Sequence, residues 1–244
     1  MIVTQITDPH VAPEEERPFG VDTRARFLDS LELQKRENSS LLILTGDLCF
    51  RDGDKETYEW MKVHLDALNI PYRILAGNHD DSTVLASVFH YGHALHPTNE
   101  LFYDEKISGF HLLYLDSGEG ILSPLQWQWL GDKMKEEPTL KKVIFMHHPP
   151  LACGVPYMDA KYPFEQSEQF EQFIAINSYS LTVFCGHYHI EKTILHPGIS
   201  ICITPSPFFT VDDRCDDFQE VTARPCYRRI VFGKEEIQTA VFYR

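Results

Sequence analysis

The stretch that decides the fold is Met1 to His10, MIVTQITDPH. It begins with an apolar run, Ile2 to Ile6, which is typical of a buried strand, and it ends in Asp8-Pro9-His10. A carboxylate and an imidazole one residue apart at a strand end can point into the same space, which suits a divalent metal ion. A lone Asp-x-His pair is usually an ordinary loop, so the interpretation depends on whether the pattern recurs.

An apolar run followed at once by residues that can bind metal recurs four times along the chain. These segments are Leu41 to Asp47, Arg73 to His79, Val143 to His148 and Leu181 to His189. Helical periodicity at Thr23 to Arg36 and Lys55 to Leu68 gives the first half a β-α-β-α-β order, which predicts a parallel or mixed sheet with helices outside. Ligands bind beyond the carboxyl ends of such strands, where Asp8, Asp47 and Asn78 are expected.

The second half of the chain is predicted to add further strands and helices. The expected elements are strands at Phe110 to Asp116, Val143 to Met146 and Leu181 to Cys185, helices at Pro124 to Met134 and Glu165 to Ile176, and hairpins at Ile194 to Ile203 and Tyr227 to Tyr243. The fold class is therefore α/β, with two mixed β-sheets packed face to face and helices on both outer faces. We expect a single domain over residues 1–244, with residues 205–244 forming a loop and hairpin next to the functional site.

Composition and charge limit the kinds of partner that the protein can bind. The 22 Lys and Arg against 36 Asp and Glu give a net charge of −14, which argues against a nucleic acid polymer or an anionic membrane surface as partner. An anionic substrate would need local positive charge, which metal ions can supply. We expect no membrane span and, because the first strand begins at Ile2, no signal peptide, so the predicted location is cytoplasmic. The six cysteines form no Cys-x-x-Cys pair, which favours reduced, mostly buried thiols.

Eight residues that follow predicted strands form the candidate site. They are Asp8, His10, Asp47, Asn78, His79, His147, His187 and His189. Oxygen and imidazole ligands without thiolate suit Mn, Fe or Zn. The set is too large for one tetrahedral ion but suffices for two ions that share one bridging carboxylate. Two such ions, ~3.5–4 Å apart, can clamp the attacking and leaving oxygens of an in-line displacement at phosphorus.

These motifs resemble those of the calcineurin-like metallophosphoesterase superfamily. The matching motifs, in order, are Asp8-Pro9-His10, Gly46-Asp47, Gly77-Asn78-His79-Asp80, His147-His148-Pro149-Pro150 and Gly186-His187-Tyr188-His189. Within the superfamily the chain looks most like bacterial class III cyclic-nucleotide phosphodiesterases and their glycerophosphodiesterase relatives. Gly20 to Thr23 and Pro225 to Arg228 support this branch, although Cys226 stands where the branch usually has glycine. The resemblance implies a four-layer αββα sandwich.

The resemblance also implies a role for each candidate residue. One metal would be held by Asp8, His10, Asp47 and His189, and the other by Asp47, Asn78, His147 and His187, with Asp47 bridging. His79 would lie beside the phosphate as electrostatic stabiliser or general acid, so that Asn78 and His79 also contact substrate. The cofactors would be two divalent ions, Mn, Fe or Zn, including mixed Fe/Mn or Fe/Zn pairs. The protein Ser/Thr phosphatase branch is disfavoured, because Phe50 stands where that branch has an aspartate.

The implied activity is metal-assisted hydrolysis of a small phosphodiester. The preferred substrate is a 3′,5′-cyclic nucleotide such as cAMP, which would give the 5′-nucleotide. A glycerophosphodiesterase or a broad-specificity phosphodiesterase is the alternative within the same chemistry. An alternative of another class is a non-catalytic, metal-dependent scaffold, which the intact motifs and His79 disfavour.

Three further histidines invite a third metal site. His90, His93 and His96 are spaced by three, but we expect them to end a helix, where positive charge suits the helix dipole and Pro97 stops the chain. His148 is interpreted as a neighbour of the ligand His147 rather than as a ligand.

The acidic segment Asp212 to Asp217 is interpreted as a solvated loop. Its alternative interpretation is a loop on the substrate side that also contributes to contacts in a homodimer. Trp127 and Trp129 are expected to pack within a helix face rather than to form a stacking platform.

Overall fold

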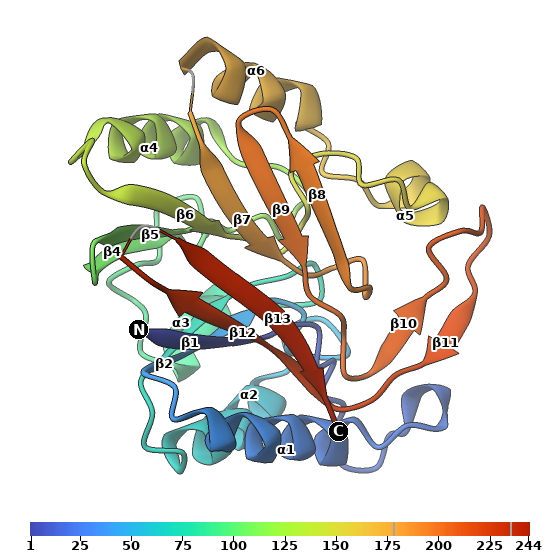
Figure 1. Cartoon of the computed structure of the whole chain (residues 1–244). Coiled ribbons are helices and arrows are strands. Elements are labelled where there is room, and N and C mark those ends of the chain that lie inside the picture. Colours follow the sequence, from blue (N-terminus) through green and yellow to red (C-terminus); the bar gives the residue numbers. More distant parts are fainter. Residues whose placement is uncertain (178, 235) are drawn as a thin grey trace.

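The computed structural model describes residues 1–177, 179–234 and 236–244. Two large sheets dominate it (Figure 1). The first sheet is built from β1 (Ile2–Ile6), β2 (Leu41–Thr45), β3 (Tyr72–Leu75), β12 (Cys226–Phe232) and β13 (Ile237–Tyr243), in the order β13-β12-β1-β2-β3. The second is built from β4 (Tyr103–Ile107), β5 (Phe110–Tyr114), β6 (Lys141–Phe145), β7 (Leu181–Cys185), β8 (Lys192–His196) and β9 (Ile199–Ile203), in the order β4-β5-β6-β7-β9-β8. A separate hairpin pairs β10 (Phe209–Val211) with β11 (Glu220–Thr222).

Helices cover the outer faces of both sheets (Figure 1). They are α1 (Thr23–Gln34), α2 (Lys55–Asp66), α3 (Ser82–Val88), α4 (Pro124–Lys135), α5 (Pro156–Lys161) and α6 (Ser167–Asn177), with short 3₁₀ helices η1 (Pro18–Gly20) and η2 (Lys35–Glu37). The predicted fold class is confirmed: both sheets mix parallel and antiparallel pairs and are flanked by helices. Among the described residues, no helix has both the length and the apolar character that crossing a membrane requires.

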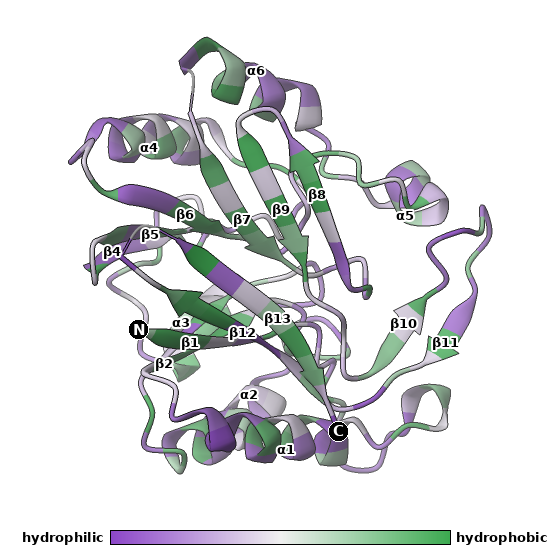
Figure 2. Cartoon of the chain, viewed as in Figure 1, coloured by the Kyte–Doolittle hydropathy of each residue, from purple (hydrophilic) through white to green (hydrophobic). Residues whose placement is uncertain are grey.

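Strand β2 shows why the sheets can be buried on both faces. Its five residues are all buried, and Leu41 and Ile43 join the core between the two sheets, whereas Leu42 and Leu44 join the core beneath α1 and α2. Successive side chains of a strand point to opposite faces, so a continuous apolar run feeds two cores at once. Figure 2 shows apolar character in strands such as β1 and β9, whereas β6 begins with hydrophilic residues and β13 and the helices are mixed.

The core between the sheets is rich in aromatic rings. Phe145 of β6 lies there, with its ring centroid 5.6 Å from that of Tyr114 and 5.4 Å from that of Phe184. A third core lies between the second sheet and α4, α5 and α6, where Trp127 and Trp129 pack, as predicted. The three cores make a four-layer sandwich in which the strand ends are held rigidly.

Strand β12, the last but one in the sequence, lies between β13 and β1 in the first sheet. It runs antiparallel to β1, which places residues from opposite ends of the chain side by side. Arg228 of β12 is buried, and its guanidinium donates to Ile203 O and Thr204 Oγ1 at the end of β9. This charged side chain therefore links the two sheets. The predicted hairpin at Tyr227 to Tyr243 is confirmed by the antiparallel pairing of β12 with β13; residue 235 lies outside the described residues.

Some elements depart from the sequence prediction. β4, α5 and the β10–β11 hairpin were not predicted, and α1 ends at Gln34 before a 3₁₀ turn. The prediction that the three spaced histidines end a helix is wrong, because all three lie beyond α3 and its C-cap Phe89. α3 stops at Val88, His90 follows with a φ of +63°, and His93 and His96 lie in the turns beyond. The ring of His96 instead stacks on Phe102, centroid to centroid at 3.5 Å.

Replacement of Phe145 by alanine is predicted to destabilise the fold strongly. The side chain is fully buried between the sheets, so Phe145→Ala leaves a cavity and is expected to lower the free energy of unfolding by ~3–5 kcal/mol. Phe242→Ala is the matched control, because Phe242 is 39% exposed on the edge strand β13, and it should cost far less. Urea unfolding of both variants followed by circular dichroism tests this, and equal losses would contradict the layered core.

Candidate metal centre

The eight candidate residues lie together, directly after five strands of the two sheets. Asp8 and His10 follow β1, Asp47 follows β2, Asn78 and His79 follow β3, His147 follows β6, and His187 and His189 follow β7. Parallel strands bring their carboxyl ends to one edge of a sheet, and here the edges of both sheets meet. All of the positions predicted from sequence are therefore brought into one site.

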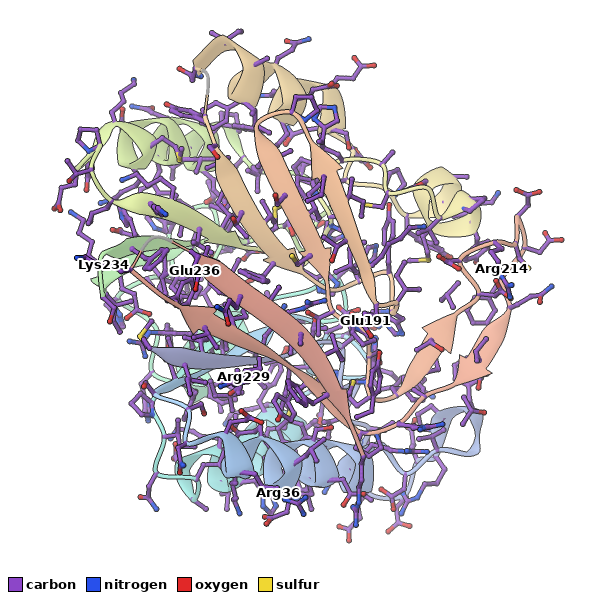
Figure 3. The ribbon with its side chains drawn as sticks, in the orientation of Figure 1. Arg36, Glu191, Arg214, Arg229, Lys234 and Glu236 are labelled. Atoms are coloured by element: carbon purple, nitrogen blue, oxygen red, sulfur yellow. The ribbon has the colours of Figure 1, made fainter. Side chains whose placement is uncertain are left out.

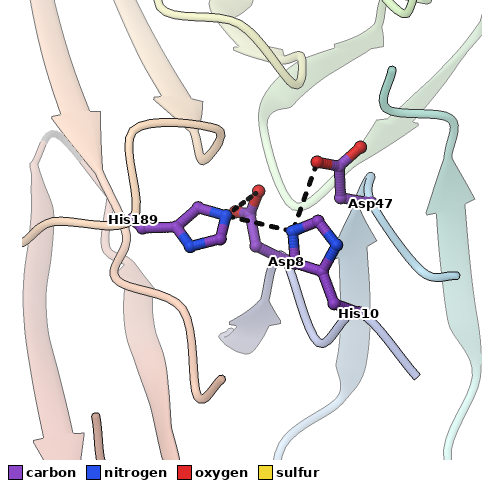
Figure 4. A group of neighbouring side chains, drawn as sticks. All are labelled: Asp8, His10, Asp47 and His189. Carbon is purple, nitrogen blue, oxygen red and sulfur yellow. Dashed lines mark hydrogen bonds and ion pairs between the residues drawn. The ribbon is translucent and has the colours of Figure 1, made fainter. Parts of the chain in front are cut away.

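One group of ligand atoms consists of Asp8, His10, Asp47 and His189 (Figure 4). The Nε2 atoms of His10 and His189 lie only 3.0 Å apart. Nε2 of His10 lies 3.4 Å from Oδ2 of Asp47, and Nε2 of His189 lies 3.4 Å from Oδ1 of Asp8. All four side chains are buried, so these atoms converge on a small enclosed space.

A second group consists of Asp47, His147 and His187. Nε2 of His147 lies 3.4 Å from Oδ1 of Asp47 and 3.1 Å from Oδ1 of Asn78. Asp47 therefore turns one carboxylate oxygen toward each group, Oδ2 toward His10 and Oδ1 toward His147. This is the arrangement that a carboxylate shared by two ions requires.

Backbone carbonyls fix the ring orientation of four site histidines. A carbonyl can only accept a hydrogen bond, so the ring nitrogen facing it carries the hydrogen and a neutral imidazole keeps its lone pair on the other nitrogen. The pairs are His147 Nδ1 with Thr45 O at 3.0 Å, His187 Nε2 with Tyr162 O at 3.0 Å, His189 Nδ1 with Phe209 O at 3.1 Å and His79 Nδ1 with Phe50 O at 3.1 Å. Such outer partners orient metal-binding histidines in general.

The pKa values show that the carboxylates and imidazoles of the site interact strongly. Burial by itself would lower the pKa of His147, but Asp47 and Asp8 raise it to about 9. Burial would raise the pKa of Asp47, yet His147 and His10 hold it well below its usual range. Burial lowers the pKa of His10 and of His187 to about 3, so both rings are neutral near pH 7 and can donate a lone pair. The site therefore offers ionised carboxylates and neutral imidazoles as ligands.

These observations fit divalent metal ions. Two buried carboxylates converge with neutral imidazole nitrogens, no thiolate lies in either group, and Nδ1 of His10 has no hydrogen-bond partner among the described residues. Carboxylate and imidazole ligands suit Mn, Fe and Zn. The two groups joined by Asp47 are suited to binding two metal ions.

The backbone of the site is strained in a consistent way. Five of its residues have positive φ values: Asp8 at +51°, His10 at +42°, Asp47 at +49°, His187 at +64° and His189 at +54°. Outside glycine this region is sparsely populated, though Asp and His tolerate it better than most residues. Strained backbone persists where the surrounding structure enforces it, which is common at functional sites.

Asp80 holds two of the site loops together, a role that was not predicted from the sequence. Its carboxylate accepts from the backbone N–H groups of Leu48, Cys49 and Gly77 and from the hydroxyl of Tyr58. The bonds join the loop of Asp47 to the loop of Asn78. The position of Asp80 in the Gly77-Asn78-His79-Asp80 motif is the sequence feature from which this role could have been predicted. Ser206, whose hydroxyl donates to Asp8 O at 2.7 Å, lies in no motif.

The remaining sequence interpretations have mixed outcomes. His148 is buried behind His187, with ring centroids 4.0 Å apart, as expected of a neighbour rather than a ligand. The acidic segment Asp212 to Asp217 forms the turn of the β10–β11 hairpin, where exposed Arg214 pairs with Asp212 (Figure 3). Phe209 and Val211 of β10, and Phe218 directly after Asp217, line the cavity above the site, so this segment borders it.

A cavity of about 380 Å³ opens over both groups. His10, Asp47, Asn78, His79, His187 and His189 line its floor, and most of its remaining wall is aromatic. His79 is held at this floor because its backbone N–H donates to Oδ1 of Asp47 at 2.9 Å. The metal groups are thus accessible to a small molecule from one side.

Comparison with known proteins places this arrangement in a class. A family model described as calcineurin-like phosphoesterase matches residues 1–191, and the chain belongs to that family. It is thus a metal-dependent phosphoesterase by class. The solved structure of a dimetal phosphatase from Danio rerio shares its fold, with a TM-score of 0.69, 15% identity and 98% of each chain covered.

Two curated relatives cover almost the whole chain. One is a 3′,5′-cyclic adenosine monophosphate phosphodiesterase of Escherichia coli strain K12, 26% identical over 99% of this chain and 89% of its own length. The other is a probable glycerophosphodiester phosphodiesterase of Arcobacter nitrofigilis, 27% identical over 97% of this chain and 90% of its own length. The two relatives differ in the ester that their names specify.

Replacement of Gly186 by alanine is predicted to damage the first metal group. A Cβ at Gly186 would collide with Oγ1 of Thr7 and Oδ2 of Asp8, so Asp8 has to move. We expect Gly186→Ala to weaken Mn²⁺ binding by roughly 10–100-fold, the usual effect of disturbing a ligand's support. Isothermal titration calorimetry with MnCl₂ measures this.

Gly131→Ala is the control for that variant. A Cβ at Gly131, in the middle of α4, meets no atom within 4 Å, so the same substitution should leave Mn²⁺ affinity unchanged and stabilise the helix by ~0.5–1 kcal/mol. If Gly186→Ala bound Mn²⁺ as tightly as the wild-type protein, the position of the Asp8 carboxylate would not matter for metal binding. That result would contradict the assignment of Asp8 as a ligand.

Proposed function

We propose that the chain is a binuclear-metal phosphodiesterase whose preferred substrate is a 3′,5′-cyclic nucleotide such as cAMP, converted to the 5′-nucleotide. The observation that carries the proposal is Asp47, whose two oxygens face two ligand groups on the floor of one open cavity. The proposed first ion is held by Asp8, His10, Asp47 and His189, and the second by Asp47, Asn78, His147 and His187. When bound, two such ions supply Lewis acidity toward phosphate and make water acidic enough to attack near neutral pH.

The cavity favours a diester over a monoester. Among the described residues that line it there is no Lys or Arg, so no permanently charged cationic side chain faces the second negative charge of a monoester dianion. A diester carries one negative charge and does not need that partner. Asn78 and His79 lie at the floor of the cavity, where we propose that they contact the phosphate.

His79 is proposed to act on the leaving oxygen. Its Nδ1–H donates to Phe50 O, so Nε2 is the nitrogen free to act on a substrate, and the ring lies against that of His10, 5.0 Å between centroids. In its protonated form His79 can donate from Nε2 to the departing alkoxide, and the same charge stabilises the developing negative charge on phosphate.

The alternatives are open to a direct assay. A glycerophosphodiester or a broad range of small diesters fits the same site chemistry, and the Arcobacter relative supports that option. A metal-dependent scaffold is disfavoured because it has no use for an open cavity above both ligand groups. A panel of cyclic nucleotides, glycerophosphodiesters and monoesters, assayed with Mn²⁺, tests the proposal, and hydrolysis of monoesters alone would contradict it.

Other features of the proposal follow from the sequence. We propose Mn, Fe or Zn as the native metals, including mixed pairs, because the ligands suit all three. We also propose that residues 1–244 act as one domain, with residues 205–244 bordering the site. Cytoplasmic residence and a homodimer stay predictions.

Loss of the shared carboxylate is predicted to abolish the two-metal site. Asp47→Ala removes an oxygen from both groups, so metal content should fall and turnover should drop by several orders of magnitude, while the fold survives because the site lies at strand ends. Metal analysis and turnover of a cyclic nucleotide measure this. Asp132→Ala, an exposed aspartate on α4, is the control. Full activity of Asp47→Ala protein after exhaustive chelation would remove the two-metal interpretation.

The role of His79 is predicted to depend on the leaving group. For a cyclic nucleotide, whose ribose alkoxide leaves poorly, His79→Ala should lower kcat by ~10²–10⁴, the usual effect of losing a positioned acid. For bis-p-nitrophenyl phosphate the loss should be small, because p-nitrophenolate leaves without a proton. Metal content should be nearly unchanged. Equal losses on both substrates would make His79 an electrostatic or positioning group instead, and loss of metal would make it a ligand.

A further inference from the structure

The wall of the cavity above the metal groups is formed by seven aromatic side chains, here named the aromatic rim. They are Phe19, Phe50, Tyr157, Tyr162, Phe208, Phe209 and Phe218. They come from parts of the chain that are far apart in sequence: the loop before α1, the loop after β2, α5 and the residue after it, and the β10–β11 hairpin with its approach. Figure 1 shows that hairpin beside α5, and η1 lies near its lower end. A wall assembled from so many segments is not a by-product of one apolar stretch.

The rings of the rim form a continuous chain. The centroid distances are 5.9 Å from Tyr162 to Tyr157, 5.7 Å from Tyr157 to Phe218, 6.5 Å from Phe218 to Phe19, 5.7 Å from Phe19 to Phe208 and 6.0 Å from Phe208 to Phe50. Phe209 sits inside this chain, 5.5 Å from Phe19 and 5.8 Å from Phe218. Aromatic pairs at these separations attract one another, which holds the wall together.

The inner end of the rim is attached to the metal groups. The ring of Phe209 lies 4.3 Å from that of His189, and the ring of Phe208 lies 5.5 Å from that of His10. Three rim residues, Phe50, Tyr162 and Phe209, also supply the backbone carbonyls that orient site histidines. A group joined to a phosphate at the metal centre therefore meets the rim directly.

The outer end of the rim is exposed in an unusual manner. Phe19 is 57% exposed and Phe218 is 41% exposed, although both are large apolar side chains. Phe19 also has a φ of +49°, which is costly for an aromatic residue and is seen where the structure enforces a conformation for use. An exposed phenyl ring on strained backbone at the mouth of a cavity is typical of a surface that a ligand covers.

The chemistry of the rim limits the group that it can bind. No Lys, Arg or Glu lines the cavity among the described residues, and the polar side-chain atoms of the rim are the hydroxyls of Tyr157 and Tyr162. An anionic group would find no cationic side chain on the rim. Flat faces of phenyl rings complement a flat ring, because stacking depends on area and not on hydrogen-bond pattern.

We propose that the aromatic rim is a base-stacking subsite: it binds the uncharged ring of a nucleobase in the substrate, with Phe19 and Phe218 as its outer contacts. The proposal rests on the proposed function, because a phosphodiester at the metal centre places the base within reach of the rim. Recognition is by ring area, so purine esters should bind better than pyrimidine esters, whereas adenine and guanine should differ little. A glycerol ester gains nothing from this surface.

Calorimetric titration of the Mn²⁺-loaded protein tests the subsite without relying on turnover. The ligands are 5′-AMP, ribose 5-phosphate and octyl phosphate, which carry the same phosphate with a base, without a base and with a flexible apolar chain. Wild-type protein should bind 5′-AMP roughly 5- to 150-fold more tightly than ribose 5-phosphate, the range expected for stacking of one base. Octyl phosphate should bind more weakly than 5′-AMP.

Substitutions at Phe19 separate stacking from general apolarity. Phe19→Leu keeps an apolar side chain without a flat ring and should weaken 5′-AMP binding by about fivefold or more, with ribose 5-phosphate changed by less than about twofold. Phe19→Tyr keeps the ring and should retain wild-type affinity. Phe242→Leu is the matched control and should change nothing, because Phe242 is an exposed phenylalanine on the edge strand β13 that does not line the cavity.

The outcomes distinguish the subsite from the proposed function. Equal affinity for 5′-AMP and ribose 5-phosphate, or equal loss of both ligands in Phe19→Leu, would overturn the subsite even if the protein hydrolyses diesters. Tighter binding of octyl phosphate than of 5′-AMP would overturn it in favour of an apolar ester. Absence of diester hydrolysis together with ring-dependent binding of 5′-AMP would overturn the proposed function and leave the subsite standing.

Discussion

The geometry of the metal centre depends on the burial of two carboxylates, Asp8 and Asp47, at the strand ends of the first sheet. A buried, uncompensated carboxylate is costly, so the protein surrounds the pair with imidazoles and fixes them through strained turns at strand ends. The layers of the fold serve this purpose, because rigid strands from both sheets must deliver ligands to one point. The chain's net charge of −14 offers this centre no surplus of positive charge, which leaves bound cations as the natural partners.

The site and the wall above it are parts of one assembly. Phe50, Tyr162 and Phe209 each contribute a carbonyl that holds a site histidine and a ring that lines the cavity. Backbone carbonyls survive substitution of the side chains, so evolution can alter the wall without losing the ligand geometry. In the proposed function, the chemistry at phosphorus and the choice of ester are carried by different atoms of the same residues.

Much of this could be predicted from the sequence, for identifiable reasons. Buried strands such as Leu41 to Thr45 are continuous apolar runs, and the residues after them are of metal-binding types. The fold class and the residues that come together in the site could therefore be predicted from the sequence. The supports of the site were not readable. Carbonyls such as Phe209 O carry no side-chain signal, and Ser206 lies in no motif. The aromatic rim was not predicted either. It depends on short strands and a short helix, in which the hydrophobic periodicity extends over too few residues to be detected.

The central claim is that Asp47 joins two ions in one centre. The most direct measurement is electron paramagnetic resonance of the protein titrated with Mn²⁺, because two Mn²⁺ ions bridged by a carboxylate are magnetically coupled and give a spectrum distinct from that of isolated ions. The account predicts two Mn²⁺ per chain and a coupled spectrum at saturation. Binding of a single Mn²⁺ per chain, or of two ions without magnetic coupling, would contradict it.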